Sequence, residues 1–401
     1  MLIQVPPEFQ GKLEPVKNLE KRTDEEILSS ILEYQPVTSE KNLWTFWDSG
    51  VHGMPAWCRR NVISWARICG PEWTVRVLDS IPESPNYGGK YIPKGLPDSF
   101  YNKTMDGTHP GPHSADFLRG ACLYEFGGAW VDSSTFLMRT MDDICWNKLE
   151  DPTCPYNVAV PVMSGILLNS FLAARKHDPF IKRWHDIFME VWKGRTNSDG
   201  MAQHPLIAPV VPYFLEKMQS YVEGGMGLNV PIEKVVEYGL QMVCWTRVSM
   251  LEDVGDGFSG ADYWPNNVLW IDCLHEVLRA FYEEGKNVPA FWKGQEVFDK
   301  FATRRDGPKD SEQYKEAEKF VWTQLTESSL LKIGTIKGMV DWVSLGTLWN
   351  RPENLGKDSE PGTFGELLRL VPQHFRQTRT DLTTWPASRS PITFKKGALE
   401  P

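Results

Sequence analysis

The sequence of 401 residues predicts an α/β protein in which a sheet is flanked by helices and followed by a largely helical second half. Three observations predict this fold. Strand-like and helix-like segments alternate from residue 42, an order typical of parallel strands joined by crossover helices. A helical pattern that stops at two glycines leads directly into another short apolar run. Amphipathic patterns then dominate the second half of the chain.

The first two predicted strands enclose a helix. Leu43–Trp47 is a short apolar run that ends at an Asp-Ser-Gly triplet, as expected of a buried strand and its exit loop. Pro55 opens the helix that follows, and Gly70 closes it. The alternating segment Trp73–Leu78 is predicted to be the second strand.

A second helix is expected to begin at its cap, Ser114, and to stop at Gly127 and Gly128. Ala129–Asp132 is then predicted to be a strand that ends on an acidic residue. Four further segments carry a helical pattern: Glu25–Tyr34, Pro179–Lys193, Ser311–Leu325 and Gly362–Leu370.

The composition is that of a globular protein, with 41% hydrophobic and 24% charged residues. A net charge of −9 argues against a protein wrapped all over in nucleic acid but leaves room for a local basic patch. We see neither a signal peptide nor an apolar run long enough to span a membrane. The seven cysteines are scattered without a C-x-x-C pair, which favours reduced thiols and a cytoplasmic protein.

The segment His113–Ser134 contains the clearest functional pattern. Asp116 and Arg119 are three residues apart on one helix face. Asp132 lies where the following strand ends, and open α/β sheets bind ligands at the carboxyl ends of their strands. Because the glycine turn folds this strand back along the helix, the three charges can meet at one cleft. Each alone could be a solvated surface charge, but together they suit a ligand with hydroxyls, amines or phosphates.

This segment resembles glycosyltransferases whose hallmark is S-D-x-x-R, a helix, and then G-G-x-x-x-D-x-D. They include the capsular-polysaccharide-synthesis and sugar-binding D-x-D families and the sugar-transferring clostridial toxins. The resemblance implies a glycosyltransferase-A-like, Rossmann-related mixed sheet flanked by helices. It also implies that Asp116 and Arg119 hold the sugar and that Asp132 contacts the nucleotide. Trp47 and Asp48 lie in a segment similar to the family's opening strand, and they are expected to bind substrate.

The second Asp of the family's D-x-D motif, which binds a divalent metal, is Ser134 in this chain. Divalent ions such as magnesium prefer anionic oxygen ligands, so we expect no metal and no other cofactor. A metal-dependent transfer would need another carboxylate, and the acidic segment Leu251–Trp264 is the candidate. That segment is alternatively a solvated, glycine-rich turn.

The resemblance also suggests how the chain is divided. Residues 1–40 are expected to form an N-terminal arm. Residues 41–371 are expected to form a glycosyltransferase-A-like catalytic domain with helical additions. Residues 372–401 are expected to form a basic C-terminal tail.

Over its whole length, the chain is similar to a fungal branch of this superfamily that includes the arginine-containing cyclodipeptide synthases. The likeness is carried by segments such as WARICGPEW, MDDICWNKLEDP, PGTFGELLRL and HFRQTR. It implies an enzyme of fungal secondary metabolism that condenses arginine from arginyl-tRNA with a second, for example aromatic, aminoacyl-tRNA. The product would be a cyclo(Arg-Xaa) diketopiperazine. Aminoacyl esters are already activated, so this reaction requires no metal, in agreement with Ser134.

In this reaction Asp116 and Asp132 are the expected catalytic carboxylates. A carboxylate can bind the arginine guanidinium through two hydrogen bonds, and a buried carboxylate can act as a base. Ser133 or Ser134 could accept an aminoacyl group as a covalent intermediate. Ser133 is otherwise expected to bind substrate beside Arg119, and a turn that caps the strand is the alternative role for both serines.

A tRNA substrate would need a positive surface, and the segment Gln373–Gly397 contains five cations and one acid. Aromatic side chains are interleaved with these cations, as in segments that bind single-stranded nucleic acid. Arg376, Arg379, Lys395 and Lys396 are therefore expected to contact tRNA phosphates.

Two other functions remain open. The dominant activity of the superfamily favours sugar transfer from a nucleotide sugar, here with a degenerate D-x-D motif. The same fold could also serve as a non-catalytic binding protein, but the retained Asp116, Arg119 and Asp132 argue against this. We predict the cyclodipeptide synthase, and the sequence does not identify its oligomeric state.

Overall fold

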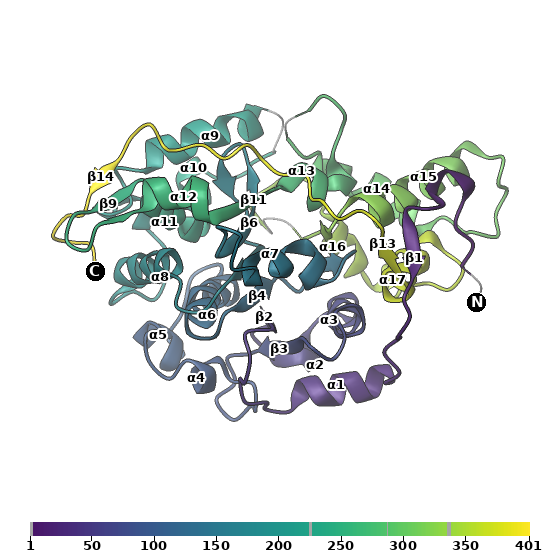
Figure 1. Ribbon diagram of the computed structural model, residues 1–401, viewed down its shortest axis with the longest axis horizontal. Helices are drawn as coiled ribbons and strands as arrows, with labels where there is room; N and C mark the ends of the chain where they lie inside the picture. Colours follow the sequence, from purple (N-terminus) through teal and green to yellow (C-terminus); the bar gives the residue numbers. More distant parts are fainter. Residues whose placement is uncertain (1–2, 224–226, 287, 335–337) are drawn as a thin grey trace.

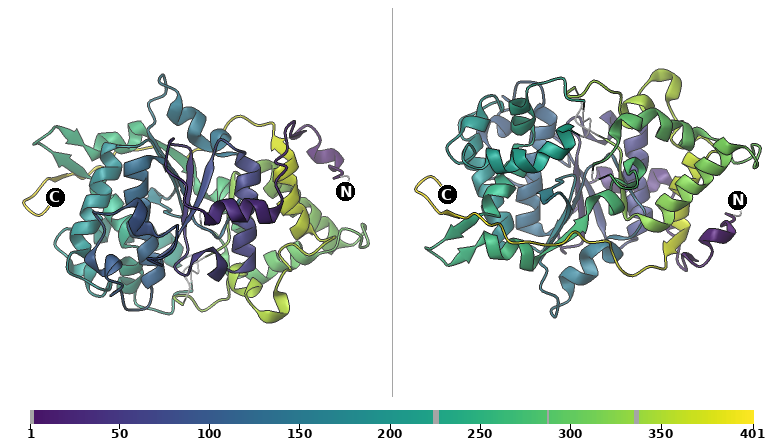
Figure 2. Two further views of the ribbon diagram at one scale, coloured as in Figure 1. Left: turned by 90° about the horizontal axis from the view of Figure 1, so that it is seen from below. Right: turned by 90° about the horizontal axis from the view of Figure 1, so that it is seen from above.

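The computed structural model describes residues 3–223, 227–286, 288–334 and 338–401. A seven-stranded mixed sheet forms its centre, and helices cover both faces of this sheet (Figure 1, Figure 2). The predicted α/β class, with a mixed sheet flanked by helices, is therefore confirmed. Within the described ranges, every helix is too short or too polar to cross a membrane.

The order of the strands puts the ends of two parallel strands side by side. The sheet runs β11-β6-β8-β4-β2-β3, and β7 pairs with β6. The strands are β2 (Asn42–Phe46), β3 (Thr74–Leu78), β4 (Gly128–Val131), β6 (Val158–Met163), β7 (Ile166–Leu167), β8 (Phe171–Ala174) and β11 (Val268–Asp272). Strand β2 is parallel to β3 and β4, whereas β8 runs antiparallel between β4 and β6. The carboxyl ends of β2 and β4 therefore lie side by side at one edge of the sheet, the edge formed by strand ends, and open α/β sheets bind ligands there.

Successive side chains of each strand point to opposite faces of the sheet, and each face buries its own hydrophobic cluster. Leu43 and Ala129 belong to one cluster, and their neighbours Trp44 and Trp130 belong to the other. Trp44 and Trp130 are at most 1% exposed, so these tryptophans are packing residues.

The helices are divided between the same two clusters. The first cluster includes α1 (Asp24–Leu32), α3 (Ala56–Cys69), α14 (Gly294–Ala302), α15 (Glu312–Glu327), α16 (Leu345–Trp349) and α17 (Phe364–His374). The second includes α4 (Gly88–Tyr91), α5 (Asp98–Tyr101), α6 (Pro110–Phe126), α8 (Pro179–Trp192), α9 (Val211–Glu223), α10 (Ile232–Tyr238) and α11 (Leu240–Val248). Two short strands outside the main sheet, β5 (Thr135–Leu137) and β12 (Leu330–Lys332), pair antiparallel with each other.

Helix α6 begins five residues earlier than the sequence predicted. Ser114 was expected to be its cap, but the helix starts at Pro110, with His109 at the cap position. Pro110 and Pro112 are tolerated because the backbone N–H groups of the first turn have no partner within the helix. Ser114 instead lies inside the helix and donates its hydroxyl to the Pro110 carbonyl at 2.8 Å. Asp116 is therefore in the second turn of α6, not in the first.

Two glycines form the turn between α6 and β4. Gly127 and Gly128 have φ angles of +70° and +100°, in the left-handed region that favours glycine. A Cβ atom on Gly128 would lie 2.8 Å from the carbonyl oxygen of Glu40 and closer still to that of Asn42. This turn therefore requires glycine at position 128, and it determines where β4 and the following Asp132 lie.

The C-terminal tail lies along the protein and covers an edge of the sheet (Figure 2). Strand β13 (Phe375–Gln377) pairs antiparallel with β1 (Leu13–Pro15), and β14 (Phe394–Lys395) pairs parallel with β9 (Leu251–Asp253). Between these two strands, residues 383–385 form backbone hydrogen bonds with the edge strand β11. The tail thus pairs backbone groups that an edge strand would otherwise leave exposed.

Replacing Gly128 by alanine should test how strongly the turn constrains the fold. We expect Gly128→Ala to lower the free energy of unfolding by more than about 3 kcal/mol, because a backbone clash is added to the left-handed conformation. Gly70→Ala is the matched control, since Gly70 has a φ of +67° but a Cβ atom there would meet no atom within 4 Å. It should cost only about 1 to 2 kcal/mol. Equal losses in urea unfolding would show that the close approach at Gly128 is unimportant.

Candidate functional site

The guanidinium of Arg119 contacts both carboxylates that the sequence singled out. Arg119 is only 3% exposed on α6. Its Nη1 atom donates to Asp116 Oδ1, and its Nη2 atom donates to Asp132 Oδ1 at 3.2 Å. The structure therefore brings Asp116, Arg119 and Asp132 together at the edge where β2 and β4 end.

Two amide side chains that the sequence analysis missed complete this charged network. Gln241 of α11 accepts a hydrogen bond from Arg119 and donates another to the Asp116 carbonyl at 2.7 Å. Asn169, just before β8, donates to Gln241 at 3.0 Å and lies 3.4 Å from Asp116 Oδ1. Gln241 lies 122 residues from Arg119 in the chain, and Asn169 lies 53 residues from Asp116. No local motif therefore marks either of them.

Lys332 contacts the carboxylate oxygen of Asp132 that Arg119 does not. Pairing between β12 and β5 places Lys332 opposite Thr135. Its ammonium group donates to Asp132 Oδ2 at 2.7 Å and to Ser134 Oγ at 2.6 Å. A lysine 200 residues away thus joins the first and last residues of the Asp-Ser-Ser segment.

Asp132 is the most accessible member of the ion pairs in this network. Its side chain is 28% exposed, compared with 9% for Asp116 and 4% for Arg119. Burial raises the pKa of Asp132, but the charges of Lys332 and Arg119 outweigh this effect and hold the pKa below its ordinary value. Asp132 is therefore ionised at neutral pH. The stability that its ionised form contributes is present above the ordinary pKa and is lost as the pH falls through the lowered pKa.

The position that the family resemblance gives to a divalent metal does not fit a metal in this chain. The Lys332 ammonium already contacts both Asp132 and Ser134, and it would repel a second cation placed there. Ser134 offers a neutral hydroxyl in place of a carboxylate. Among the residues that the structure describes, no three His, Cys, Asp or Glu side chains are grouped so that they could hold a metal ion.

The carboxylates of the acidic segment Leu251–Trp264 are paired with cations of this chain. The segment forms β9, a turn, β10 (Phe258–Ser259) and the start of α12 (Gly260–Asn267). Each of its four carboxylates contacts a cation: Glu252 with Lys395, Asp253 with Lys396, Asp256 with Arg183, and Asp262 with Arg389. Three of these cations belong to the C-terminal tail, so the segment holds the tail in place.

The other residues predicted to bind substrate lie around the same strand ends. Ser133 is buried, and its carbonyl accepts a hydrogen bond from Asn61 at 2.8 Å. Trp47 directly follows β2 and is half-buried. Asp48 is exposed and accepts a hydrogen bond from the Ser80 hydroxyl. Trp47 and Asp48 therefore lie at the edge of the sheet where β4 also ends.

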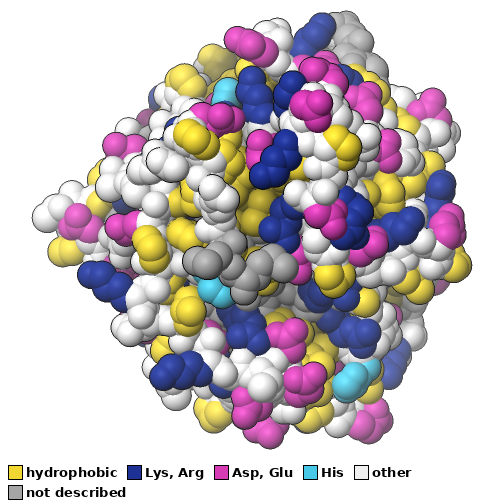
Figure 3. Space-filling view, turned by 90° about the vertical axis from the view of Figure 1, so that its right-hand side faces the viewer, with side chains coloured by type: hydrophobic (Ala, Val, Ile, Leu, Met, Phe, Trp, Pro, Cys, Tyr) yellow, Lys and Arg dark blue, Asp and Glu magenta, His cyan; other side chains and the backbone are white. Residues whose placement is uncertain are grey.

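The four tail cations predicted to contact tRNA phosphates contact this protein instead. Arg376 donates to backbone carbonyls, and Arg379 binds both carboxylate oxygens of the buried Glu276 at 2.7 Å. Lys395 and Lys396 bind the acidic segment described above. Figure 3 shows the right-hand side of Figure 1, away from β14, and basic and acidic side chains are interspersed on that face too. The positive charge of the tail is therefore compensated by acids that are distant in the sequence.

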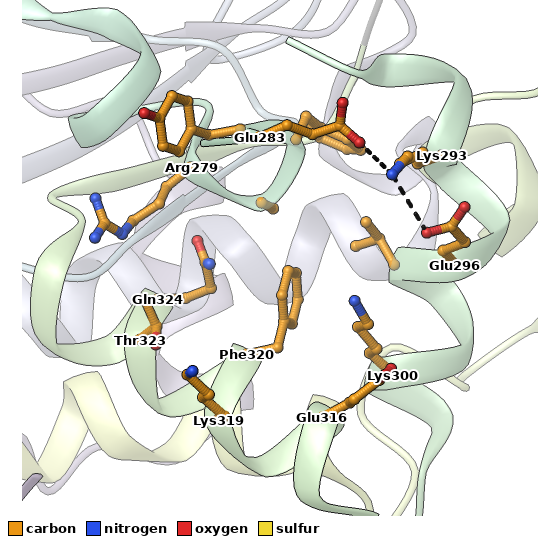
Figure 4. A pocket seen from close by; sticks show the side chains of 14 residues that line it. Arg279, Glu283, Lys293, Glu296, Lys300, Glu316, Lys319, Phe320, Thr323 and Gln324 are labelled. Atoms are coloured by element: carbon orange, nitrogen blue, oxygen red, sulfur yellow. Dashed lines mark ion pairs between the residues drawn. The ribbon is translucent and has the colours of Figure 1, made fainter. Parts of the chain in front are cut away.

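A pocket of about 360 Å³ opens between η4 (Arg279–Phe281), α14 and α15, away from the predicted site residues (Figure 4). Its wall includes Phe320, and the Lys300 ammonium lies 5.0 Å from the centre of that ring. Lys293, also in the wall, is paired with Glu283. The lining of this pocket contains none of the residues of the charged network, so the pocket is separate from that site.

Comparisons with known proteins point to one family. A family model described as capsular polysaccharide synthesis protein matches residues 4–206. A probable glycosyltransferase of Fusarium pseudograminearum, FCK3, is 44% identical over the full length of both chains. The O-glycosyltransferase braB of Annulohypoxylon truncatum is 38% identical over 99% of this chain and 94% of its own. The O-glycosyltransferase PaGT of Phomopsis amygdali is 36% identical over 91% of this chain and 90% of its own. A solved structure, the PaToxG glycosyltransferase, is 14% identical over 55% of this chain and 91% of its own, with a TM-score of 0.28.

These relatives overturn the predicted arginine-containing cyclodipeptide synthase. Each is named a glycosyltransferase and aligns over at least 90% of both chains. The predicted substrates, arginyl-tRNA and a second aminoacyl-tRNA, are therefore wrong, and so is the predicted diketopiperazine product. Two of the features that favoured this function have another explanation in the contacts within the chain. Lys332 lies where the metal ligand is missing, and the tail cations bind acids of the same chain.

Removing the guanidinium at the centre of the network should destabilise the protein. We expect Arg119→Met to lower the free energy of unfolding by about 3 to 5 kcal/mol, because it leaves a buried carboxylate without its partner. Arg304→Met removes an equal charge from the exposed Arg304–Asp306 pair and should leave the melting temperature nearly unchanged. If Arg119→Met has the same melting temperature as the wild-type protein, the network does not hold α6 to β4.

Proposed function

The chain belongs to the capsular polysaccharide synthesis family, and from this premise we propose that it is a glycosyltransferase. It would take a sugar from a nucleotide-sugar donor and pass it to a hydroxyl group of an acceptor. The names of the O-glycosyltransferase relatives support this acceptor chemistry. The observation that carries the proposal is the network of Asp116, Arg119 and Asp132 at the carboxyl ends of two parallel strands.

In this proposal Asp116 and Arg119 hold the donor sugar. Both are almost buried and are fixed in place by Gln241 and Asn169, so they can orient hydroxyl groups without first being ordered. The Nε atom of Arg119 is buried and has no hydrogen-bond partner among the residues that the structure describes. An unpaired buried donor is costly, and a sugar hydroxyl is a group that could accept its hydrogen bond.

Asp132 is proposed to contact the nucleotide side of the donor. It is ionised and partly exposed, and it lies at the edge where β2 also ends. Trp47 offers an aromatic surface to a base, and Asp48 offers a carboxylate to donor hydroxyls. We assign the catalytic function to residues 41–371, which contain all of these side chains.

The transfer breaks one bond and forms another at the anomeric carbon of the sugar. The bond from this carbon to the diphosphate oxygen breaks, and its electron pair leaves with the nucleoside diphosphate. The acceptor oxygen forms the new bond, and the proton of its hydroxyl is released to solvent overall. The enzyme therefore has to bind the sugar and to stabilise negative charge on the departing phosphate oxygen.

The assay for this proposal needs no knowledge of the acceptor. The purified protein is incubated with UDP-glucose, UDP-galactose, UDP-N-acetylglucosamine or GDP-mannose, and slow hydrolysis by water is followed through release of UDP or GDP. We expect release from at least one donor, and Asp132→Asn should slow it by about 100-fold or more. The rates are compared well below the melting temperature, because Arg119 and Lys332 each lose a charged partner in this variant and the protein should be less stable.

Asp256→Asn is the matched control, since it removes the same charge from a surface pair with Arg183. Its hydrolysis rate should equal that of the wild-type protein. Absence of release from every donor, tested again with related nucleotide sugars, would contradict the proposed function. Full activity of Asp132→Asn would contradict the role of this carboxylate.

A further inference from the structure

We infer that Lys332 replaces the divalent cation of the family pattern and stabilises the nucleoside diphosphate as it leaves. The inference rests on the proposed sugar transfer and names the group that performs its charge-stabilising step. Lys332 comes from β12, far from the D-x-D position in sequence, and it is not part of any motif that the sequence shows. Its ammonium nevertheless contacts both Asp132 and Ser134, the first and last residues of that position.

The local charge supports this replacement. A divalent cation beside the two carboxylates of an intact D-x-D motif gives a net charge of zero. An ammonium group bound to one carboxylate and one hydroxyl also gives zero. The loss of a carboxylate at Ser134 and the presence of Lys332 therefore compensate each other. A lysine beside two aspartates would leave this group with a net negative charge, and so would an aspartate and a serine without the lysine.

Lys332 is held in position by the backbone around it. The backbone N–H of Lys332 donates to the Val277 carbonyl at 3.0 Å, and that of Ile333 donates to the Ser134 carbonyl at 3.2 Å. Gly334 packs so closely that a Cβ atom there would lie 2.6 Å from Ser134 Oγ. The ammonium is thus placed by strand pairing, and a preorganised charge costs little reorganisation during a reaction.

The ammonium also has capacity for a ligand. It carries three N–H donors, and among the residues that the structure describes, Asp132 and Ser134 take two of them. The side chain of Lys332 is 13% exposed, at the edge of the sheet where Asp132 is reachable. A phosphate oxygen can take the third donor. When the bond from the anomeric carbon to this oxygen breaks, its electron pair stays on the phosphate, and the ammonium stabilises the negative charge that develops.

Binding of inorganic pyrophosphate in the presence of EDTA measures this role independently of turnover. By titration calorimetry we expect the wild-type protein to bind it without metal, and Lys332→Gln to bind it about tenfold more weakly or worse. Lys332→Arg keeps the charge and should stay within about threefold of the wild type. Lys315→Gln removes an exposed lysine of α15 as a matched control and should bind normally.

Turnover of a donor hydrolysed by the wild-type protein gives a second measurement. EDTA should leave the wild-type rate unchanged, and Lys332→Gln should lower it about 100-fold. The double variant Ser134→Asp with Lys332→Ala restores two carboxylates and removes the ammonium. Its rate should rise about tenfold or more on addition of manganese, a response that a purely structural lysine would not produce. Melting temperatures identify any variant that fails to fold. In that case the inference is tested by pyrophosphate binding to Lys332→Arg and by the effect of EDTA on the wild-type rate.

The outcomes separate the two proposals. If EDTA abolishes wild-type hydrolysis, or if Lys332→Gln binds pyrophosphate and turns over donor as well as the wild type, the inference is overturned and sugar transfer stands. A double variant that is equally slow with and without manganese also overturns the replacement of a cation by Lys332. If no nucleotide sugar is hydrolysed but pyrophosphate binding depends on Lys332, sugar transfer fails while a diphosphate site at Lys332 stands.

Discussion

The contact of one guanidinium with two carboxylates is the interaction on which the rest of the site depends. Arg119 lies on α6, and Asp132 follows β4, so their ion pair ties a helix to the strand that comes after it. This is possible only because the two glycines between them reverse the chain within two residues. A buried ion pair adds little stability by itself, but its loss leaves a charge without a partner in the interior. The fold therefore keeps all three charges at the edge of the sheet where a ligand can bind.

Local patterns predicted the elements that form this edge. The observed β2 and β3 agree with the predicted strands to within one residue at each end, because their apolar runs are bounded by clear turn signals. The start of α6 was misplaced because Pro110 and Pro112 resemble a loop, although the first turn of a helix accepts both. The contact of Asp116 with Arg119 follows from their spacing on the helix. Their contact with Asp132 depends on the glycine turn, which the sequence also shows.

Contacts between distant segments could not be predicted in the same way. Lys332, Gln241 and Asn169 reach the site through strand pairing and helix packing, and nothing beside them in the sequence marks them. The tail illustrates the reverse error. Its cations form a one-sided group in the sequence, yet in the fold they meet Glu276 and the acids of residues 251–264. A local excess of charge is thus weak evidence for nucleic-acid binding until its partners within the chain are known.

The paired tail has a consequence for how this chain reaches its folded state. Strand β13 pairs with β1 near the start of the chain, and residues 383–385 form backbone hydrogen bonds with β11 at the outer strand of the main sheet. Such pairings close very long loops, so they form late in folding and slow it. Until the tail docks, β11 presents an open row of backbone donors and acceptors to other copies of the chain. Aggregation during synthesis should therefore depend on how quickly the tail docks, more than on the stability that the sheet has once it is covered.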